Sequence, residues 1–185
     1  MKNILAILSV VLLTLTYSYI KSKNNSTHSA DVDNSSNPIL KDLPNFEAVS
    51  LRSGIVFNRD KIKNLKPKMV IVHFWGTWCA PCEAEFPSFL DMAKKLENQK
   101  NIYFLFIAVK DLQKAVEKFI GKFPQFPKNV TILLNPNGEI LQNFGTVKVP
   151  ETYIFDAQLK TQLKLIGPQD WSDNLQQERI LKLLK

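Results

Sequence analysis

The amino-acid sequence predicts an α/β fold in which helices flank a central mixed β-sheet. Two nearly continuous apolar runs, residues 68–75 and 102–109, are typical of strands buried on both faces. Each run is followed by a segment whose apolar residues recur at helical spacing. Further on, two shorter apolar runs resemble a strand pair before a last helix. Strands that alternate with helices and then form a hairpin indicate a mixed sheet with helices on both faces.

The composition sets the size and excludes several classes of protein. The chain has 185 residues, 45% of them hydrophobic, which fits one globular domain with an extension and excludes collagen-like or wholly disordered chains. The net charge of +7 is scattered along the chain, so we expect no nucleic-acid partner. Two cysteines are too few for a disulfide scaffold or a four-cysteine zinc site.

The amino terminus predicts export. Residues 4–20 form an uncharged apolar run that would reach roughly 25 Å as a helix, just short of a typical hydrocarbon core. Residues 1–20 are therefore expected to be a signal anchor or a cleaved signal peptide. We favour the anchor, because no A-x-A pattern follows and the run exceeds a usual signal core. The domain would then lie on the periplasmic, extracytoplasmic side of a cell membrane; the alternative is secretion into the periplasm after cleavage.

A polar segment separates this run from the folded part. Residues 21–40 contain little apolar surface to offset the entropy of ordering, so they are expected to form a flexible polar tether. The domain itself spans residues 41–185. Its other expected elements follow from turn signals and periodicity: a hairpin of 46–51 and 55–57, a helix at 59–65, a helix after the cysteines, a helix at 112–121, a strand at 130–134, strands at 152–155 and 162–166, and a helix at 172–184.

Cys79 and Cys82 carry the predicted chemistry. They lie three residues apart where a buried strand passes into a helix. A cysteine at a helix amino terminus faces unpaired N–H groups and the helix dipole, which favour the thiolate. Pro81 suits the first helical turn, where its missing N–H costs nothing. We predict that Cys79 is the attacking thiolate and Cys82 the resolving thiol of a redox pair.

The sequence gives less support to other roles for the two cysteines. A C-x-x-C pair can be half of a zinc site, but the sequence has no second pair and only two histidines, so no metal is expected. A purely structural disulfide across so short a loop would constrain little of the unfolded chain. No cofactor beyond the redox-active disulfide of Cys79 and Cys82 is expected.

Residues 74–82, Phe-Trp-Gly-Thr-Trp-Cys-Ala-Pro-Cys, with Glu85, Phe86 and Pro87 after them, resemble the thioredoxin superfamily. Within it the chain is similar to the exported, membrane-anchored oxidoreductases of the TlpA/ResA/CcmG group, the last also called DsbE, over about residues 41–185. The resemblance implies a thioredoxin-like fold with an added N-terminal β-hairpin at 46–57 and a central insertion near 110–130.

The resemblance also implies a substrate-binding surface. Val149-Pro150 resembles the family's cis-proline loop, which faces the cysteines and pairs with the substrate backbone; a simple strand-start proline is the alternative. Glu151, directly after it, would shape partner choice or thiol pKa. Trp78 and Pro81 would belong to the surface that meets the partner.

Two further residues are candidates for proton transfer. Glu85 lies one turn after Cys82, and partial burial would raise its pKa and let it exchange protons with Cys82; the alternative is a solvated helix residue. His73 stands where thioredoxins carry a buried acid and this group often carries Asn. Strand alternation would place it beneath the cysteines, as a proton acceptor for Cys82 or, as we slightly favour, a neutral core histidine.

The expected function is a specific reductase of protein disulfides. A membrane electron donor of the thiol–disulfide type would keep it reduced, because an export compartment is oxidising. Candidate substrates, by resemblance, are apocytochrome c during cytochrome c biogenesis and the cysteines of copper sites. A disulfide-forming oxidant, a copper-binding chaperone and a thiol peroxidase remain alternatives, in that order. We expect a monomer.

Overall fold

The computed structural model describes Thr16 and residues 40–184. Apart from Thr16 and Leu40, the predicted anchor (residues 1–20) and tether (residues 21–40) lie outside the described residues. The chain divides into two units, Met1–Asn37 and Pro38–Lys185, and every element named below belongs to the second. Within the part of the chain that the structure describes, no helix has the length and apolar character needed to cross a membrane.

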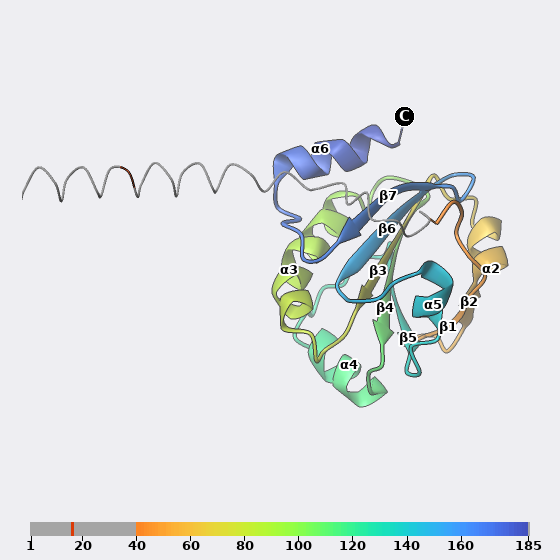
Figure 1. The fold of residues 1–185 in the computed structure, drawn as a ribbon, viewed down its shortest axis with the longest axis vertical. Helices are drawn as coiled ribbons and strands as arrows, with labels where there is room; N and C mark the ends of the chain where they lie inside the picture. The colour runs from red at the N-terminus through yellow and green to blue at the C-terminus, as the bar shows by residue number, and fades with distance from the viewer. Residues whose placement is uncertain (1–15, 17–39, 185) are drawn as a thin grey trace, which may run out of the picture. The chain divides into compact units, whose positions relative to one another are not determined.

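A seven-stranded mixed sheet forms the centre of the second unit (Figure 1). Its order is β2-β1-β5-β4-β3-β6-β7, with β3, β4 and β5 parallel and the other pairings antiparallel. This confirms the predicted mixed sheet. The strands are β1 (Glu47–Ser50), β2 (Val56–Asn58), β3 (Met69–Trp75), β4 (Ile102–Val109), β5 (Val130–Asn135), β6 (Glu151–Asp156) and β7 (Thr161–Ile166).

Helices cover both faces of the sheet, also as predicted (Figure 1). The apolar residues of α3 (Ala80–Lys95), α4 (Gln113–Ile120) and α6 (Asn174–Lys182) join one core cluster. Those of α2 (Arg59–Asn64) and α5 (Ile140–Phe144) join a second cluster on the other face. We call these two sides the α3 face and the α5 face. Helix α5 was not predicted, because its five residues are too few to show a helical period.

The added hairpin and the region of the expected insertion are both visible. Strands β1 and β2 pair around a turn in which Gly54 has a φ of 65°, a left-handed conformation that favours glycine. Residues 110–130 contain α4, the crossover helix between the parallel strands β4 and β5. These features complete the thioredoxin-like α/β architecture.

Strand β3 links the core to the site. All seven of its residues are buried, which explains its continuous apolar sequence. Because side chains alternate along a strand, Ile71 and Trp75 point to the α3 face, whereas Val72 and Phe74 point to the α5 face. His73, which lies between Ile71 and Trp75 in this alternation, therefore faces α3 and the cysteines.

Candidate active site

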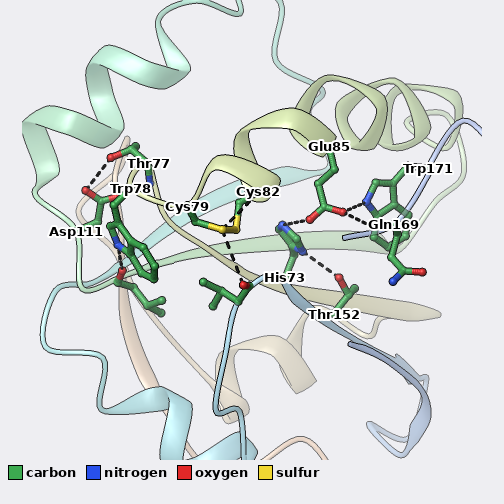
Figure 2. Close-up of a disulfide and its surroundings, with 12 residues drawn as sticks. His73, Thr77, Trp78, Cys79, Cys82, Glu85, Asp111, Thr152, Gln169 and Trp171 are labelled. Atoms are coloured by element: carbon green, nitrogen blue, oxygen red, sulfur yellow. Dashed lines mark hydrogen bonds and ion pairs between the residues drawn. A yellow bond between two sulfur atoms is a disulfide. The ribbon is translucent and has the colours of Figure 1, made fainter. Parts of the chain in front are cut away.

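A disulfide joins Cys79 to Cys82 at the amino terminus of α3 (Figure 2). Cys79 is the N-cap residue, with an extended backbone, and its Sγ accepts a hydrogen bond from the Cys82 backbone N–H at 3.3 Å. Pro81 lies in the first helical turn, where its missing N–H leaves no hydrogen bond unmade. The Cys82 N–H at this helix end therefore points at the sulfur that we predict to be the nucleophile.

The two sulfurs differ in access. Cys82 is fully buried, whereas 5% of Cys79 is exposed and its neighbour Trp78 is 56% exposed. The Trp78 indole donates a hydrogen bond from Nε1 to the carbonyl of Val109 at 3.1 Å. A Cβ atom at Gly76 would lie 2.6 Å from that Nε1, so only glycine fits beneath the ring. A partner approaching from outside reaches Cys79 before Cys82, beside an exposed aromatic surface.

Asp111, just past the end of β4, holds the turn before the cysteines (Figure 2). Its carboxylate accepts hydrogen bonds from the Thr77 backbone N–H at 2.6 Å and the Thr77 hydroxyl at 3.0 Å. It also accepts the Leu112 backbone N–H at 2.8 Å. Sequence reasoning did not single out Asp111, because its contact with Thr77 spans 34 residues. The one available signal was an acid at the carboxyl end of a strand parallel to β3.

The loop between α5 and β6 approaches the same end of the sheet. The Val149–Pro150 peptide bond is cis, as the resemblance implied, and the Val149 carbonyl oxygen lies 3.9 Å from Cys79 Sγ. The carbonyl therefore faces the more accessible sulfur. Val147, earlier in the loop, is 82% exposed. The segments that carry Cys79 and Val149 therefore each have an exposed apolar side chain, Trp78 and Val147 respectively.

Glu85 is buried, 5% exposed, on the second turn of α3. Its Oε2 accepts a hydrogen bond from the Gln169 backbone N–H at 2.8 Å and another from the Trp171 indole at 2.9 Å. Burial outweighs these two bonds and raises the pKa of Glu85 to about 7. The solvated-residue alternative is wrong, and the carboxyl group can gain or lose a proton near neutral pH.

His73 lies between the disulfide and the Glu85 carboxylate in Figure 2. Its Nδ1 is 2.9 Å from the hydroxyl of Thr152, and its Nε2 is 3.7 Å from Glu85 Oε1. The rings of Phe89 and Phe106 pack edge-on against the imidazole. Complete burial lowers the pKa of His73 to about 3, so the imidazole is neutral at physiological pH. It therefore provides hydrogen-bonding groups and no positive charge.

Glu151 is the one predicted site residue that the structure separates from the cysteines. It alternates along β6 with Thr152, so its side chain turns to the α5 face. There it is 1% exposed, accepts a hydrogen bond from the Tyr153 hydroxyl at 2.9 Å, and pairs with Lys164 at 3.2 Å. The remaining predicted residues gather at one end of the α3 face and its rim: Trp78, Cys79, Pro81, Cys82, Glu85, His73, Val149 and Pro150.

The site contains acid, imidazole and sulfur groups, but they do not form a metal-binding set. Among residues 40–184, no cluster of three or more His, Cys, Asp or Glu side chains is arranged to hold a metal ion. What the arrangement provides is a dithiol–disulfide pair at a helix amino terminus, with a buried carboxyl group on the next turn of the same helix. These groups are the ones that thiol–disulfide exchange uses.

Comparisons with known proteins agree with this geometry. The AhpC/TSA family matches residues 39–163. The thiol-disulfide oxidoreductase ResA of Bacillus thuringiensis subsp. konkukian is 28% identical over 132 residues, which cover 71% of each chain. The ResA of Bacillus subtilis is 27% identical over 119 residues, 64% of this chain and 62% of that protein.

A solved structure shows the same fold. A thiol:disulfide interchange protein of the thioredoxin family from Chlorobium tepidum superposes with a TM-score of 0.61 and 23% identity, over 78% of this chain and 97% of that one. The family match, the fold and the cysteine pair lead to one identification. The chain belongs to the AhpC/TSA family and is a thiol-disulfide oxidoreductase of thioredoxin-like fold, with Cys79 and Cys82 as its redox pair.

Proposed function

We propose that this oxidoreductase is an exported reductase of specific protein disulfides, anchored by residues 1–20. A membrane electron donor of the thiol–disulfide type would re-reduce it. Its substrates would be the cysteine pair of apocytochrome c or the cysteines of a copper site. The observation that carries the reductase direction is the neutral, proton-accepting environment behind Cys82, formed by His73 and Glu85.

The direction of electron flow depends on what stabilises the reduced pair. Strong oxidants of this class stabilise the thiolate, commonly with a nearby cation, and so favour the reduced form. Here the basic side chain beside the disulfide, His73, is kept neutral by burial. In its ionised form, Glu85 would repel a thiolate and would not stabilise it. This environment favours the disulfide form and a low reduction potential.

The proposed cycle transfers two electrons to the substrate. The Cys79 thiolate attacks one sulfur of the substrate disulfide, which forms a mixed disulfide and releases the other substrate sulfur as a thiolate. Cys82 then loses its proton to the Glu85 carboxylate and attacks Cys79 Sγ. The Cys79–Cys82 disulfide forms, and the second substrate sulfur leaves as a thiolate that solvent protonates. The donor dithiol reverses these steps.

The proposed substrate-binding surface lies around Cys79. Trp78 directly precedes Cys79, and the Val149 carbonyl oxygen of the Val149–Pro150 loop lies 3.9 Å from Cys79 Sγ. That carbonyl would accept a hydrogen bond from a substrate backbone N–H during the mixed-disulfide stage. The loop therefore suits an extended peptide that carries the target cysteine. Glu151, turned to the other face, would act on this loop only indirectly.

The first experiment combines two single-cysteine variants with a peptide that contains an intramolecular C-x-x-C-H disulfide, the haem-attachment pattern. Cys82→Ser should accumulate a mixed disulfide between Cys79 and the peptide, visible by mass spectrometry. Cys79→Ser should accumulate none and show no turnover. A Cys82→Ser protein that turns over normally would refute the assignment of the two roles.

The reduction potential tests the direction. Equilibration of the full-length protein in detergent with glutathione or dithiothreitol should give a value near or below about −270 mV, the thioredoxin value. A value near about −120 mV, that of a strong oxidant, would make disulfide formation the working function instead. Carbonate extraction of membranes, in which the protein should stay with the pellet, tests the anchor.

A further inference from the structure

A row of three buried polar side chains runs across the α3 face behind the disulfide (Figure 2). Thr152 of β6, His73 of β3 and Glu85 of α3 come from three different elements and meet between the sheet and the helix. His73 and Thr152 are register partners on neighbouring strands, which fixes the hydroxyl beside Nδ1. The third contact, His73 Nε2 to Glu85 Oε1, is 3.7 Å.

The two oxygens of Glu85 have different surroundings. Oε2 accepts both N–H groups, from Gln169 and Trp171, and such an oxygen has no room for a proton of its own. Oε1 is buried and has no hydrogen-bond partner within the described structure. When Glu85 is protonated, the proton therefore resides on Oε1, the oxygen that faces His73.

His73 Nε2 is likewise buried and has no hydrogen-bond partner within the described structure. Two unpartnered buried polar atoms that face each other are costly unless they pair. At 3.7 Å they stand beyond hydrogen-bond range, and a movement of about 0.5 Å would bring them into it. The apolar rings of Phe89 and Phe106 also pack against the imidazole, and Figure 2 shows the disulfide on the side away from Glu85.

A neutral imidazole carries one N–H, and a hydroxyl can either donate or accept a hydrogen bond. With the proton on Nδ1, the imidazole donates to Thr152 and offers the lone pair of Nε2 to a protonated Glu85. With the proton on Nε2, it donates to an ionised Glu85 and accepts the Thr152 O–H at Nδ1. Both protonation states of Glu85 thus find a fully matched partner without any charge on His73.

We propose that His73 and Thr152 are positioning residues that make Glu85 a reversible proton acceptor, with the His73 tautomer changing each time Glu85 gains or loses its proton. The inference rests on the proposed proton exchange between Cys82 and Glu85. On reduction of the disulfide, the Oε1–H bond of Glu85 breaks and the proton forms the S–H bond of Cys82. The imidazole releases its Nδ1 proton and takes up another at Nε2 by exchange with water, so it still carries a single N–H, which now faces the carboxylate. On oxidation the proton returns to Oε1 and the imidazole N–H returns to Nδ1.

The test is nitrogen NMR of the His73 ring in the full-length protein. His28→Gln leaves His73 as the single histidine, since the sequence has two. In the oxidised protein we expect the Nδ1–H tautomer below pH 6 and the Nε2–H tautomer above pH 8, with a midpoint near pH 7. One tautomer at every pH, or a charged imidazole in this range, would overturn the proposal.

Two matched variants of Thr152 test whether its hydroxyl positions the His73 ring or whether its side chain only fills space. Thr152→Val preserves the shape but removes the hydroxyl. The Nδ1–H tautomer loses an acceptor and the Nε2–H tautomer loses a donor, and a buried N–H without an acceptor is the more costly of the two losses. The tautomer midpoint should fall by about one pH unit, the tenfold change in proton affinity expected from one hydrogen bond of ordinary strength. Thr152→Ser should restore it. Equal midpoints in both variants and the parent would contradict the role of Thr152.

Peptide reduction, measured on the same samples, keeps the two proposals distinguishable. Normal turnover with an invariant tautomer would refute this inference and leave the reductase function intact. A tautomer change with pH in a protein that does not reduce disulfides would refute the reductase function, while supporting the positioning role of His73 and Thr152 toward Glu85.

Discussion

Two buried glutamates, Glu85 on helix α3 and Glu151 on strand β6, make an instructive pair. Glu85 on the α3 face is 5% exposed and Glu151 on the α5 face is 1% exposed, so both are removed from water to a similar degree. Glu151 has a lysine at 3.2 Å and a tyrosine hydroxyl at 2.9 Å. Glu85 has two N–H donors on one oxygen, while its other oxygen faces a neutral imidazole without a hydrogen bond.

The difference between the two lies in the partners and not in the depth of burial. Glu151 is paired with Lys164 and is part of the contact between β6 and β7. A buried carboxylate that lacks a cation gains a proton easily, and burial raises the pKa of Glu85 to about 7. The α3 face therefore has a carboxyl group available for chemistry, whereas the α5 face has one committed to holding β6 and β7 together. The predictions below test this contrast.

The largest effect is expected from Glu85→Gln. Glutamine keeps the acceptor for Gln169 and Trp171 but cannot take a proton, so the attack of Cys82 on the mixed disulfide should slow about 100-fold. The rate, followed by stopped flow from pH 5 to 9, should also lose its transition near pH 7. An unchanged profile would return Glu85 to a structural role.

The same substitution should stabilise the protein in alkaline conditions. Because folding raises the pKa of Glu85 from 4.5 to about 7, the native state gains relative stability below pH 4.5 and loses it as the pH rises through 7. Glu85→Gln avoids that loss, so its advantage in the free energy of unfolding should grow from near zero at pH 4.5 to about 3 kcal/mol at pH 8. Urea denaturation at the two pH values measures it.

His73→Asn should change stability in the opposite pH range. Burial lowers the pKa of His73 from 6.5 to about 3, so the wild-type protein loses stability as the pH falls below 6.5. Asparagine does not titrate, and its cost in lost packing is independent of pH. Relative to wild type, the variant should gain about 3 kcal/mol between pH 6.5 and pH 4, measured by urea denaturation. A constant difference between the two proteins would mean that His73 is not held neutral by burial.

Glu151→Gln should lower the free energy of unfolding and leave the reactivity of the thiols unchanged. The amide can still accept the Tyr153 hydroxyl, but Lys164, whose side chain is 22% exposed, loses its counter-charge. We expect a loss of about 1–3 kcal/mol in the free energy of unfolding, with no shift in the pH profile of thiol alkylation. If the alkylation profile moved as far as in Glu85→Gln, the two faces would not be functionally distinct.

Asp111→Asn should have the smallest effect. Asp111 is a third carboxylate, at the rim of the site, and its partners are backbone N–H groups and the Thr77 hydroxyl. Losing one charge-assisted bond should cost about 1 kcal/mol and lower kcat/KM for peptide reduction severalfold, because the turn before Cys79 loosens. Asp156→Asn, at the β6–β7 turn, is the matched control, because Asp156 also accepts two backbone N–H bonds and should affect stability alone.

Sequence reasoning succeeded where the information is local. The apolar runs of β3 and β4, the helix after the cysteines and the capping position of Cys79 all depend on periodicity or on residues within one turn of each other. The position of His73 beneath the cysteines also followed, since alternation along one strand is a local property. The short helix α5 was missed because five residues carry no readable period.

The hydrogen-bond partners of the site residues could not be predicted from local sequence patterns. The two N–H donors of Glu85 come from 84 and 86 residues further along the chain, and the partner of Thr77 from 34 residues away. The face of Glu151 depended on how β6 is registered against β3, which its position after Pro150 does not reveal. The sequence thus determines which groups can do redox chemistry, because residues close together along the chain determine the strand, the turn and the helix cap that position the two cysteines. Whether a given carboxyl group titrates near neutral pH or stays a fixed charge is set by folding, because burial and distant partners govern its pKa.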